Sequence, residues 1–271
     1  APAVLLPHSF ASDVPGLREA TVKAGLVGRI LATFRVEEVI LYPDRRGSPD
    51  VRNARWLKEI LDYLTTAPYL RTVKYPLKPS LRYAGLLPPL NIPTHPEADA
   101  VKSDGTHYRQ ALVVASGETS TLEAGLRKPI KIKKKLSKNT VVNLRVKVKG
   151  RRIKYGLVPR TDPVYTGFRT RIADSFEDAL KPFSFKIAAS RLGQPVNEVL
   201  GVLRERMRGG RVCVAFGAAD RGLRQIAEEL ELDLGTLFDV VVNFAPGQGV
   251  KTIRTEEALA YTLAILNLIS L

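Results

Sequence analysis

The sequence predicts an α/β protein with a parallel sheet, interrupted by a small basic β-barrel domain. Near both ends of the chain, short apolar runs alternate with helical patterns, which is typical of βαβ units. Between them, apolar and cationic residues alternate with the two-residue period of a strand. Proline-rich stretches at residues 75–96 and 158–163 flank this middle part, as the linkers of an inserted domain would. We therefore expect a discontinuous α/β domain of residues 1–75 and 164–271 and an inserted barrel domain of residues 76–163.

The N-terminal part predicts a βαβ unit. Residues 4–6 and 39–42 are short apolar runs, and between them apolar residues recur at helical spacing over residues 17–34. We expect Asp13 to cap this helix and Pro15 to lie in its first turn, because both residue types favour helix starts.

The inserted part carries most of the positive charge. Residues 128–154 contain twelve basic residues and no acidic one. Apolar positions alternate with them, so the pattern predicts strands with one face in the core and one cationic face. We expect these strands at residues 111–115, 129–133, 141–149 and 153–158. The cationic face is a candidate RNA-binding surface formed by Lys131, Lys133, Lys135, Arg145, Lys147, Lys149, Arg151 and Arg152. A solubilising charged face is the alternative.

The C-terminal part returns to alternating strands and helices. Its apolar runs predict parallel strands at residues 185–189, 212–216 and 240–244. Its helical patterns predict helices at residues 198–208, 223–232 and 256–268, the last of them capped by Thr255. This last helix is apolar nearly all round, so we expect it to be central to the fold or packed on a second subunit.

Composition excludes several classes of protein. The formal net charge is +15 and the pI is about 10, which favours a polyanionic partner. The sequence contains no run of about 18 uncharged apolar residues that could cross a membrane. Residues 1–6 do not resemble a signal peptide, so we expect a cytoplasmic protein. The single cysteine, Cys213, excludes a disulfide framework and a cysteine-based zinc site. The three histidines are scattered, so no metal is expected.

Two loops that follow predicted strands could hold a ligand, because open parallel sheets bind ligands at the carboxyl ends of their strands. Residues 216–222 and residues 243–249 each contain two glycines, which let a ligand approach the backbone closely. Neither loop has the spacing of a dinucleotide fingerprint or a P-loop, so a nucleoside triphosphate is not expected. Ordinary tight turns are the structural alternative.

Residues 237–258 contain the most specific motif of the chain. Its elements are Leu237-Phe238-Asp239, Asn243, Pro246, Gln248-Gly249 and the run from Thr252 to Ala258. With Pro7, Ser9 and Asp13 near the N-terminus and residues 214–217 in the middle loop, this motif resembles the SPOUT superfamily of trefoil-knot methyltransferases. The resemblance covers nearly the whole chain and is greatest to the archaeal and eukaryotic subfamily with an inserted OB-fold domain. Residues 218–222 depart from the Gly-Leu-x-Gly pattern of that family.

The resemblance implies a parallel-sheet domain with a C-terminal trefoil knot, an OB-like barrel at the insert, and a homodimer with both active sites at the subunit interface. It implies S-adenosylmethionine as the cofactor, held by Ala188, Ala189, Ser190, Gly217, Ala218, Asn243, Pro246, Gly249, Ile253 and Thr255. Arg29 aligns with an arginine that related enzymes use near the acceptor, although a structural ion pair is the alternative for it. Arg254 and Glu256 are further catalytic candidates, for holding the acceptor or the dimer partner.

The expected function is that of an S-adenosylmethionine-dependent RNA methyltransferase acting on a nucleotide base, with ribosomal RNA as the expected substrate. The alternative is a non-catalytic RNA-binding or assembly protein that retains the knot fold. Methyl transfer from a sulfonium depends mainly on aligning the acceptor. An acceptor that carries a proton also needs a base or a stabilising cation. The sequence leaves the acceptor open between base and ribose.

Overall fold

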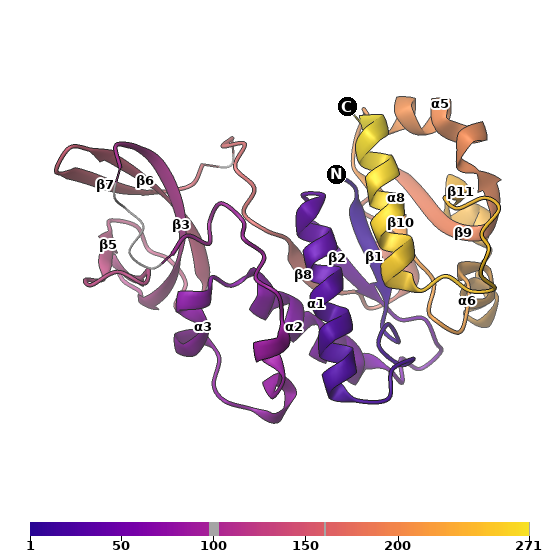
Figure 1. Ribbon diagram of the computed structural model, residues 1–271, viewed down its shortest axis with the longest axis horizontal. Helices are drawn as coiled ribbons and strands as arrows, with labels where there is room; N and C mark the ends of the chain where they lie inside the picture. Colours follow the sequence, from indigo (N-terminus) through magenta and orange to yellow (C-terminus); the bar gives the residue numbers. More distant parts are fainter. Residues whose placement is uncertain (98–102, 160, 271) are drawn as a thin grey trace. The chain divides into compact units, whose positions relative to one another are not determined.

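The computed structural model describes residues 1–97, 103–159 and 161–270 (Figure 1). Contacts divide the chain into two compact units. The first, called the α/β unit below, comprises Ala1–Asp62, Tyr83–Pro88 and Phe168–Leu271, and the second, the barrel unit, comprises Tyr63–Arg82 and Pro89–Gly167. The sequence pattern assigns residues 63–75 to the α/β domain, whereas their contacts group them with the barrel.

Gln110 is the residue that attaches this segment to the barrel. Its side-chain oxygen accepts a hydrogen bond from the Ala67 amide at 2.7 Å, and its side-chain nitrogen donates to the Thr65 carbonyl at 2.8 Å. The Tyr69 hydroxyl donates to the Gln110 carbonyl at 2.9 Å. Since Gln110 is buried, these bonds satisfy polar groups that would otherwise be costly to bury. Helix α3 (Pro68–Lys74) is thereby part of the barrel unit.

A six-stranded sheet forms the centre of the α/β unit, and every neighbouring pair of strands runs parallel. Its order is β11 (Val240–Asn243), β9 (Phe185–Pro195), β10 (Val212–Ala215), β1 (Ala3–Pro7), β2 (Glu38–Tyr42) and β8 (Arg169–Ile172). The predicted parallel sheet is confirmed. The apolar pattern misses β8, because this edge strand reads Arg-Thr-Arg-Ile and is only partly buried.

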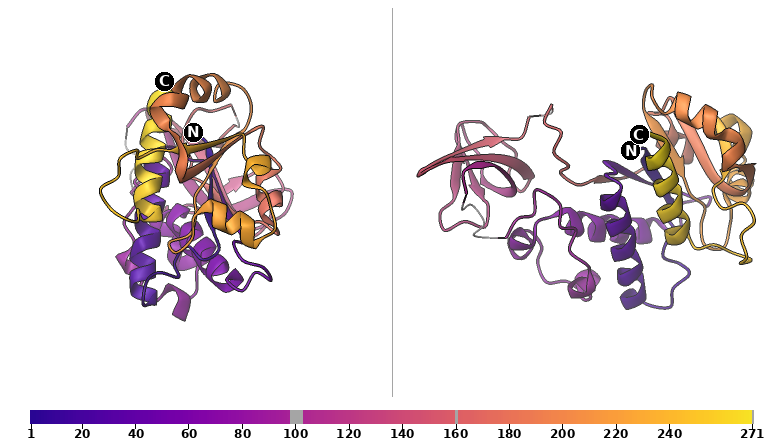
Figure 2. Two further views of the ribbon diagram at one scale, coloured as in Figure 1. Left: turned by 90° about the vertical axis from the view of Figure 1, so that its right-hand side faces the viewer. Right: turned by 45° about the horizontal axis from the view of Figure 1, so that its top comes forward.

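Helices cover both faces of this sheet. Leu5, Ile40 and Cys213 belong to one buried cluster with residues of α4 (Phe176–Leu180), α6 (Leu223–Glu229) and α7 (Leu234–Leu237). Helices α1 (Leu17–Thr33) and α8 (Thr255–Ser270) are neighbours on the other face, and α5 (Val196–Arg206) contacts α8 (Figures 1 and 2). Because β1 is buried from both sides, its sequence is continuously apolar. Helix α2 (Val51–Thr65) follows β2.

Asp13 does not cap α1, and that prediction is wrong. The N-cap is Gly16, which has no side chain to accept a hydrogen bond. The Asp13 carboxylate instead accepts two hydrogen bonds from Lys23 Nζ, at 2.6 and 2.8 Å. A charged partner one and a half turns into the helix is a stronger donor than a backbone amide, so it takes the carboxylate away from the helix start.

Thr255 is the first residue of α8 rather than its cap, which corrects the second predicted helix start. Its hydroxyl donates to the Gly217 carbonyl at 3.2 Å. The Glu257 carboxylate accepts from the Arg254 amide at 2.9 Å, so the helix is capped from inside its first turn. The threonine is thereby free to connect α8 with the loop that follows β10.

Strand β9 is longer than predicted and is interrupted. Val241 of β11 pairs with Ala188, but Val242 pairs with Gln194, so residues 189–193 leave the ladder as a loop. Gly193 crosses directly over β11, because a Cβ added to it would lie 2.6 Å from backbone atoms of Val241 and Val242. Only glycine permits this approach of two backbones.

The barrel unit contains a five-stranded antiparallel sheet. Its order is β5 (Ile130–Ile132), β4 (Ser120–Glu123), β3 (Gly105–Ala115), β6 (Val141–Lys149) and β7 (Arg152–Leu157). The edge strands β5 and β7 contact each other, so the sheet is nearly closed around an apolar interior that includes Val113, Leu122 and Leu144. The short turns η1 (Pro79–Leu81) and η2 (Ala84–Leu86) precede it. No helix among the described residues is long and apolar enough to span a bilayer.

Candidate functional site

A cavity of about 440 Å³ opens where β9, β10 and β11 end. Four parts of the chain line it: residues 189–192, residues 216–225, residues 242–244 with Gln248, and, around the start of α8, Lys251, Thr252, Ile253, Thr255, Ala258, Tyr261 and Thr262. This is the end of the sheet at which parallel folds bind ligands. The volume and the mixed polar and apolar lining are typical of a small-molecule site.

Most of the residues expected to hold the cofactor line this cavity. They are Ala189, Ser190, Gly217, Ala218, Asn243, Ile253 and Thr255. Ala188 is fully buried in β9, directly before the first of them. Pro246 and Gly249 belong to the loop after β11 but are not among the described residues that line the cavity.

The loop of residues 216–222 is held at its start by two side chains. The Tyr42 hydroxyl donates to the Phe216 carbonyl at 2.6 Å, and the Thr255 hydroxyl donates to the Gly217 carbonyl. A Cβ added to Gly217 would lie 2.8 Å from the Arg221 carbonyl, because the loop folds back on itself. Burial raises the pKa of Tyr42 well above its usual value, so its hydroxyl remains a donor at neutral pH.

The two other loops of the cavity are bonded to each other. The Asn243 side chain donates to the Arg191 carbonyl at 3.1 Å and accepts from the Ala245 amide at 3.0 Å. The Arg191 guanidinium donates to the Lys251 carbonyl at 2.9 Å. Asn243 therefore acts as a brace between loops, a role that its place in the sequence motif does not reveal.

Three lining residues of α8, Ala258, Tyr261 and Thr262, are absent from the predicted set of cofactor residues. Tyr261 is partly buried, while Thr262 is fully buried and its hydroxyl has no hydrogen-bond partner among the described residues. A buried hydroxyl without a partner is unfavourable, so Thr262 is suited to bind a polar ligand atom. Its spacing of seven residues from Thr255, two helical turns, is the signal that could have found it.

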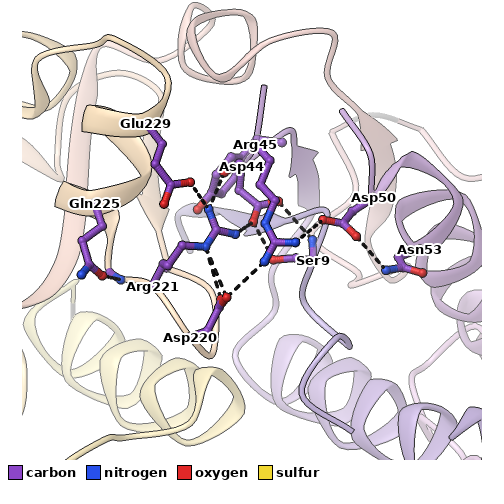
Figure 3. Close-up of polar contacts among 12 residues, drawn as sticks. Ser9, Asp44, Arg45, Asp50, Asn53, Asp220, Arg221, Gln225 and Glu229 are labelled. Carbon is purple, nitrogen blue, oxygen red and sulfur yellow. Dashed lines mark hydrogen bonds and ion pairs between the residues drawn. The ribbon is translucent and has the colours of Figure 1, made fainter. Parts of the chain in front are cut away.

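Arg221 is the centre of a buried charge network at one wall of the cavity (Figure 3). Its guanidinium contacts Asp44 Oδ2 at 2.7 Å, the Asp44 carbonyl at 2.8 Å and Glu229 Oε2 at 2.7 Å. Asp44 also accepts from the amide and the hydroxyl of Ser9, at 3.1 and 2.5 Å. Burial alone would lower the pKa of Arg221, but Asp44, Asp220 and Glu229 outweigh it and raise that pKa.

The three catalytic candidates lie in different surroundings. Arg29 is on α1 and is not among the described lining residues of the cavity. Arg254 is exposed just before α8. Glu256 is buried and forms an ion pair with Lys23 Nζ at 3.4 Å, so its carboxylate links α8 to α1.

Cys213 and His8 are buried in or beside the sheet. Burial raises the pKa of the Cys213 thiol to about 12, which leaves it without nucleophilic thiolate at neutral pH. Burial lowers the pKa of His8, whose Nε2 lies 3.2 Å from the Leu41 carbonyl. In the part of the chain that the structure describes, no three His, Cys, Asp or Glu side chains gather in a group that could hold a metal ion.

Comparison with known proteins assigns the family. The sequence model of the family described as "Putative RNA methyltransferase" matches residues 2–266. This chain belongs to that RNA methyltransferase family. It is 32% identical to an uncharacterized protein of Halobacterium salinarum and 32% identical to one of Haloarcula marismortui, each over 98% of both chains. It is 30% identical to a 28S rRNA (uridine-N(3))-methyltransferase of Homo sapiens, over 97% of this chain and 77% of that protein.

Several residues of the predicted cationic face lie opposite one another in the barrel sheet of the methyltransferase. Lys147 pairs with Lys154 and Lys149 pairs with Arg152 across β6 and β7. Like charges directly opposite each other destabilise a sheet. Of the other predicted positions, Lys131 lies on β5 and Arg145 on β6, where Arg145 contacts Asp162 at 3.6 Å.

Charge is divided unequally between the two units of the methyltransferase. The barrel unit contains 20 Lys and Arg against 6 Asp and Glu, whereas the α/β unit contains 22 against 21. Nearly the whole net charge of +15 therefore belongs to the unit without the cavity. The excess positive charge and the cavity therefore belong to different units.

Proposed function

We propose that this chain transfers a methyl group from S-adenosylmethionine to N3 of a uridine in ribosomal RNA. The observation that carries the proposal is the cavity at the carboxyl ends of β9, β10 and β11, which gathers seven of the ten expected cofactor residues. The human relative is named for this reaction, and it aligns with 97% of the chain. The cofactor, the acceptor atom and the ribosomal substrate are all parts of the proposal.

The lining of the cavity fits such a cofactor. Gly217 and Ala218 present backbone without bulky side chains, and the hydroxyl of Thr262 supplies a buried polar contact. Ser190 and Asn243 add polar side chains to the lining. S-adenosylmethionine would supply the methyl group, activated by its sulfonium. The residues of the chain have to hold the uridine in line with that methyl group and exclude water.

In the transfer, the N–C bond forms as the C–S bond of the donor breaks, and the electron pair of that bond stays on the sulfur. N3 of a neutral uridine also carries a proton, which we propose is released to solvent water before or during the transfer. A nearby cation would stabilise the uridine anion, and Arg29 and Arg254 remain the proposed residues for this role. Glu256 is held by Lys23, so we propose that it orients the start of α8 rather than accepting the proton.

We further propose a homodimer that packs through α1 and α8. Val22 and Leu26 on α1 are each about half exposed, and Leu268 on α8 is 70% exposed. Arg29 lies one turn beyond Leu26 on the same face of α1, because residues three and seven positions apart align on a helix. A second copy on this face would place Arg29 at the subunit interface, which accounts for its position away from the cavity of its own chain.

The crossing of Gly193 over β11 supports the proposed C-terminal knot, because a knot needs backbones in direct contact. The strand order of the barrel unit supports an OB-like barrel. In such barrels the second and third strands and the loop between the last two strands bind nucleic acid. In this chain those parts are β4, β5 and the β6–β7 turn; Lys131 lies on β5, Arg151 lies in the turn, and Arg152 follows it as the first residue of β7. We propose that they bind the RNA backbone, with Lys133, Lys135, Arg145, Lys147 and Lys149.

The proposed reaction is tested by incubating the full chain with methyl-labelled S-adenosylmethionine and ribosomal RNA that lacks the modification. Nucleosides are then analysed by mass spectrometry. We expect 3-methyluridine at one position, and a Thr262→Val variant with a KM for the donor raised by about threefold to tenfold, as loss of one buried hydrogen bond predicts. A Val202→Thr variant, changed on the exposed face of α5, is the matched control.

The possible outcomes separate the alternatives. Label in a different base or in ribose would contradict the N3 assignment. Donor binding without label in any RNA would favour the alternative of a non-catalytic assembly protein. Absence of donor binding would refute the proposal for the cavity as a whole.

A further inference from the structure

The loop of residues 216–222 lines the cavity mainly with small residues. Gly217, Ala218 and Ala219 line the cavity but have little side chain with which to pack the loop in place. Ordering a flexible loop when a ligand binds reduces affinity, so a tight site needs the loop ordered in advance. The carbonyls of Phe216 and Gly217 are held by Tyr42 and Thr255, which fixes the first part of the loop only.

Arg221 fixes the far end of the same loop. Its side chain is 11% exposed and reaches Asp44, whose side chain is fully buried. Asp44 follows β2 and is itself bonded to Ser9, which follows β1. One guanidinium thus joins the loops after three neighbouring strands, β2, β1 and β10 (Figure 3).

We propose that Arg221 and Asp44 form a latch that holds the 216–222 loop in its ligand-binding shape, with Arg221 as a positioning residue for the cofactor. The inference rests on the proposed function and adds a residue pair to it. The guanidinium of Arg221 donates to Asp44, Glu229 and, through Nε at 3.4 Å, Asp220, so we propose that it acts on the ligand through the loop backbone.

The chain offers a matched control at the other end of the same strands. Arg211 precedes β10 and pairs with Glu38, the first residue of β2, at 2.7 Å. This ion pair also joins β10 to β2, but its arginine side chain is 59% exposed and lies at the amino end of the sheet. Arg211→Met therefore removes an arginine of the same connectivity without touching the cavity.

The test measures binding of S-adenosylhomocysteine to the full chain by calorimetry, for Arg221→Met, Asp44→Asn, the double variant and Arg211→Met. We expect each single change in the latch to raise the Kd for S-adenosylhomocysteine about tenfold or more. The Kd of the double variant should not exceed that of the weaker-binding single variant, since both substitutions remove the same contact between Arg221 and Asp44. Arg211→Met should stay within about twofold of the parent. Arg221→Lys keeps the charge but fewer donors, so its Kd should be intermediate.

Two further readouts distinguish positioning from general loss of structure. In steady-state assays, Arg221→Met should raise the KM for the donor while kcat at saturating donor changes by less than about threefold. Amide hydrogen exchange without ligand should become faster within residues 217–222 and stay unchanged in β1 and β10.

The latch is overturned if Arg221→Met binds as tightly as the parent, if Arg211→Met weakens binding to the same extent, or if exchange increases throughout the sheet. If the parent binds no donor at all, the proposed function fails. The exchange measurement still decides the latch in that case, because it needs no ligand.

Discussion

His95 shows how a single residue of the barrel unit makes stability depend on pH. It is partly buried, and its Nε2 lies 3.0 Å from the Thr65 carbonyl. Burial lowers its pKa from 6.5 to about 4. The neutral form is therefore favoured in the folded protein, and the unfolded chain binds a proton that the folded chain does not.

We expect this histidine to reduce stability as pH falls from 6.5 to about 4. Above pH 6.5 both states are neutral at His95, so its contribution is complete there; at pH 5 the loss is about 2 kcal/mol. Denaturant unfolding of the parent and of His95→Gln at pH 7 and pH 5 measures it. The variant should lose less stability between these pH values, and His107→Gln, changed at a partly buried histidine whose Nε2 lies 2.8 Å from the Ser103 carbonyl, is the histidine control. Equal pH dependence in all three proteins would contradict the role of His95.

At the scale of elements, the hairpin of β6 and β7 places like charges opposite each other. Lys147 faces Lys154 and Lys149 faces Arg152, and the repulsion within each pair destabilises the hairpin. The apolar side chains that alternate with these residues, such as Leu144 and Val146, belong to the buried interior of the barrel. The cationic face is thus a consequence of strand periodicity combined with a closed core.

The hairpin predicts how RNA binding should respond to salt. In the double variant Lys147→Ala/Lys149→Ala, a plot of the logarithm of the RNA association constant against the logarithm of the salt concentration should be less steep. The magnitude of its slope should fall by about 1.5, as expected for two lost phosphate contacts. Arg204→Ala/Arg208→Ala, which removes two exposed cations of the α/β unit, is the control. Filter binding at 50 to 200 mM salt gives both slopes. The same slope for the hairpin variant as for the parent would place the RNA elsewhere.

At the scale of the whole molecule, the two units differ in charge. The barrel unit contains nearly all of the net charge, while the α/β unit exposes apolar side chains on α1 and α8. An apolar face on two neighbouring helices is a typical site for association between copies of one chain.

We expect Leu26→Glu to convert the proposed dimer to a monomer. Burying an unpaired carboxylate in an apolar interface should weaken self-association by about 100-fold or more. Sedimentation equilibrium at micromolar concentration measures the change, and Val202→Glu on α5 is the matched control because it makes the same kind of substitution at a similarly exposed position. A monomeric parent, or a dimer unaffected by Leu26→Glu, would remove the interface and with it the proposed role of Arg29.

Local periodicity, charge and motif are enough to predict the alternating strands and helices, the cationic barrel strands and the family. They do not determine the two helix starts, since Asp13 and Thr255 are engaged by partners that only the fold brings near. Tertiary structure alone decided that Arg221 meets Asp44, 177 positions away, because β10 lies beside β1 and β1 beside β2 in the sheet. Strand order is set by packing over the whole domain, so no local pattern in the chain encodes that contact.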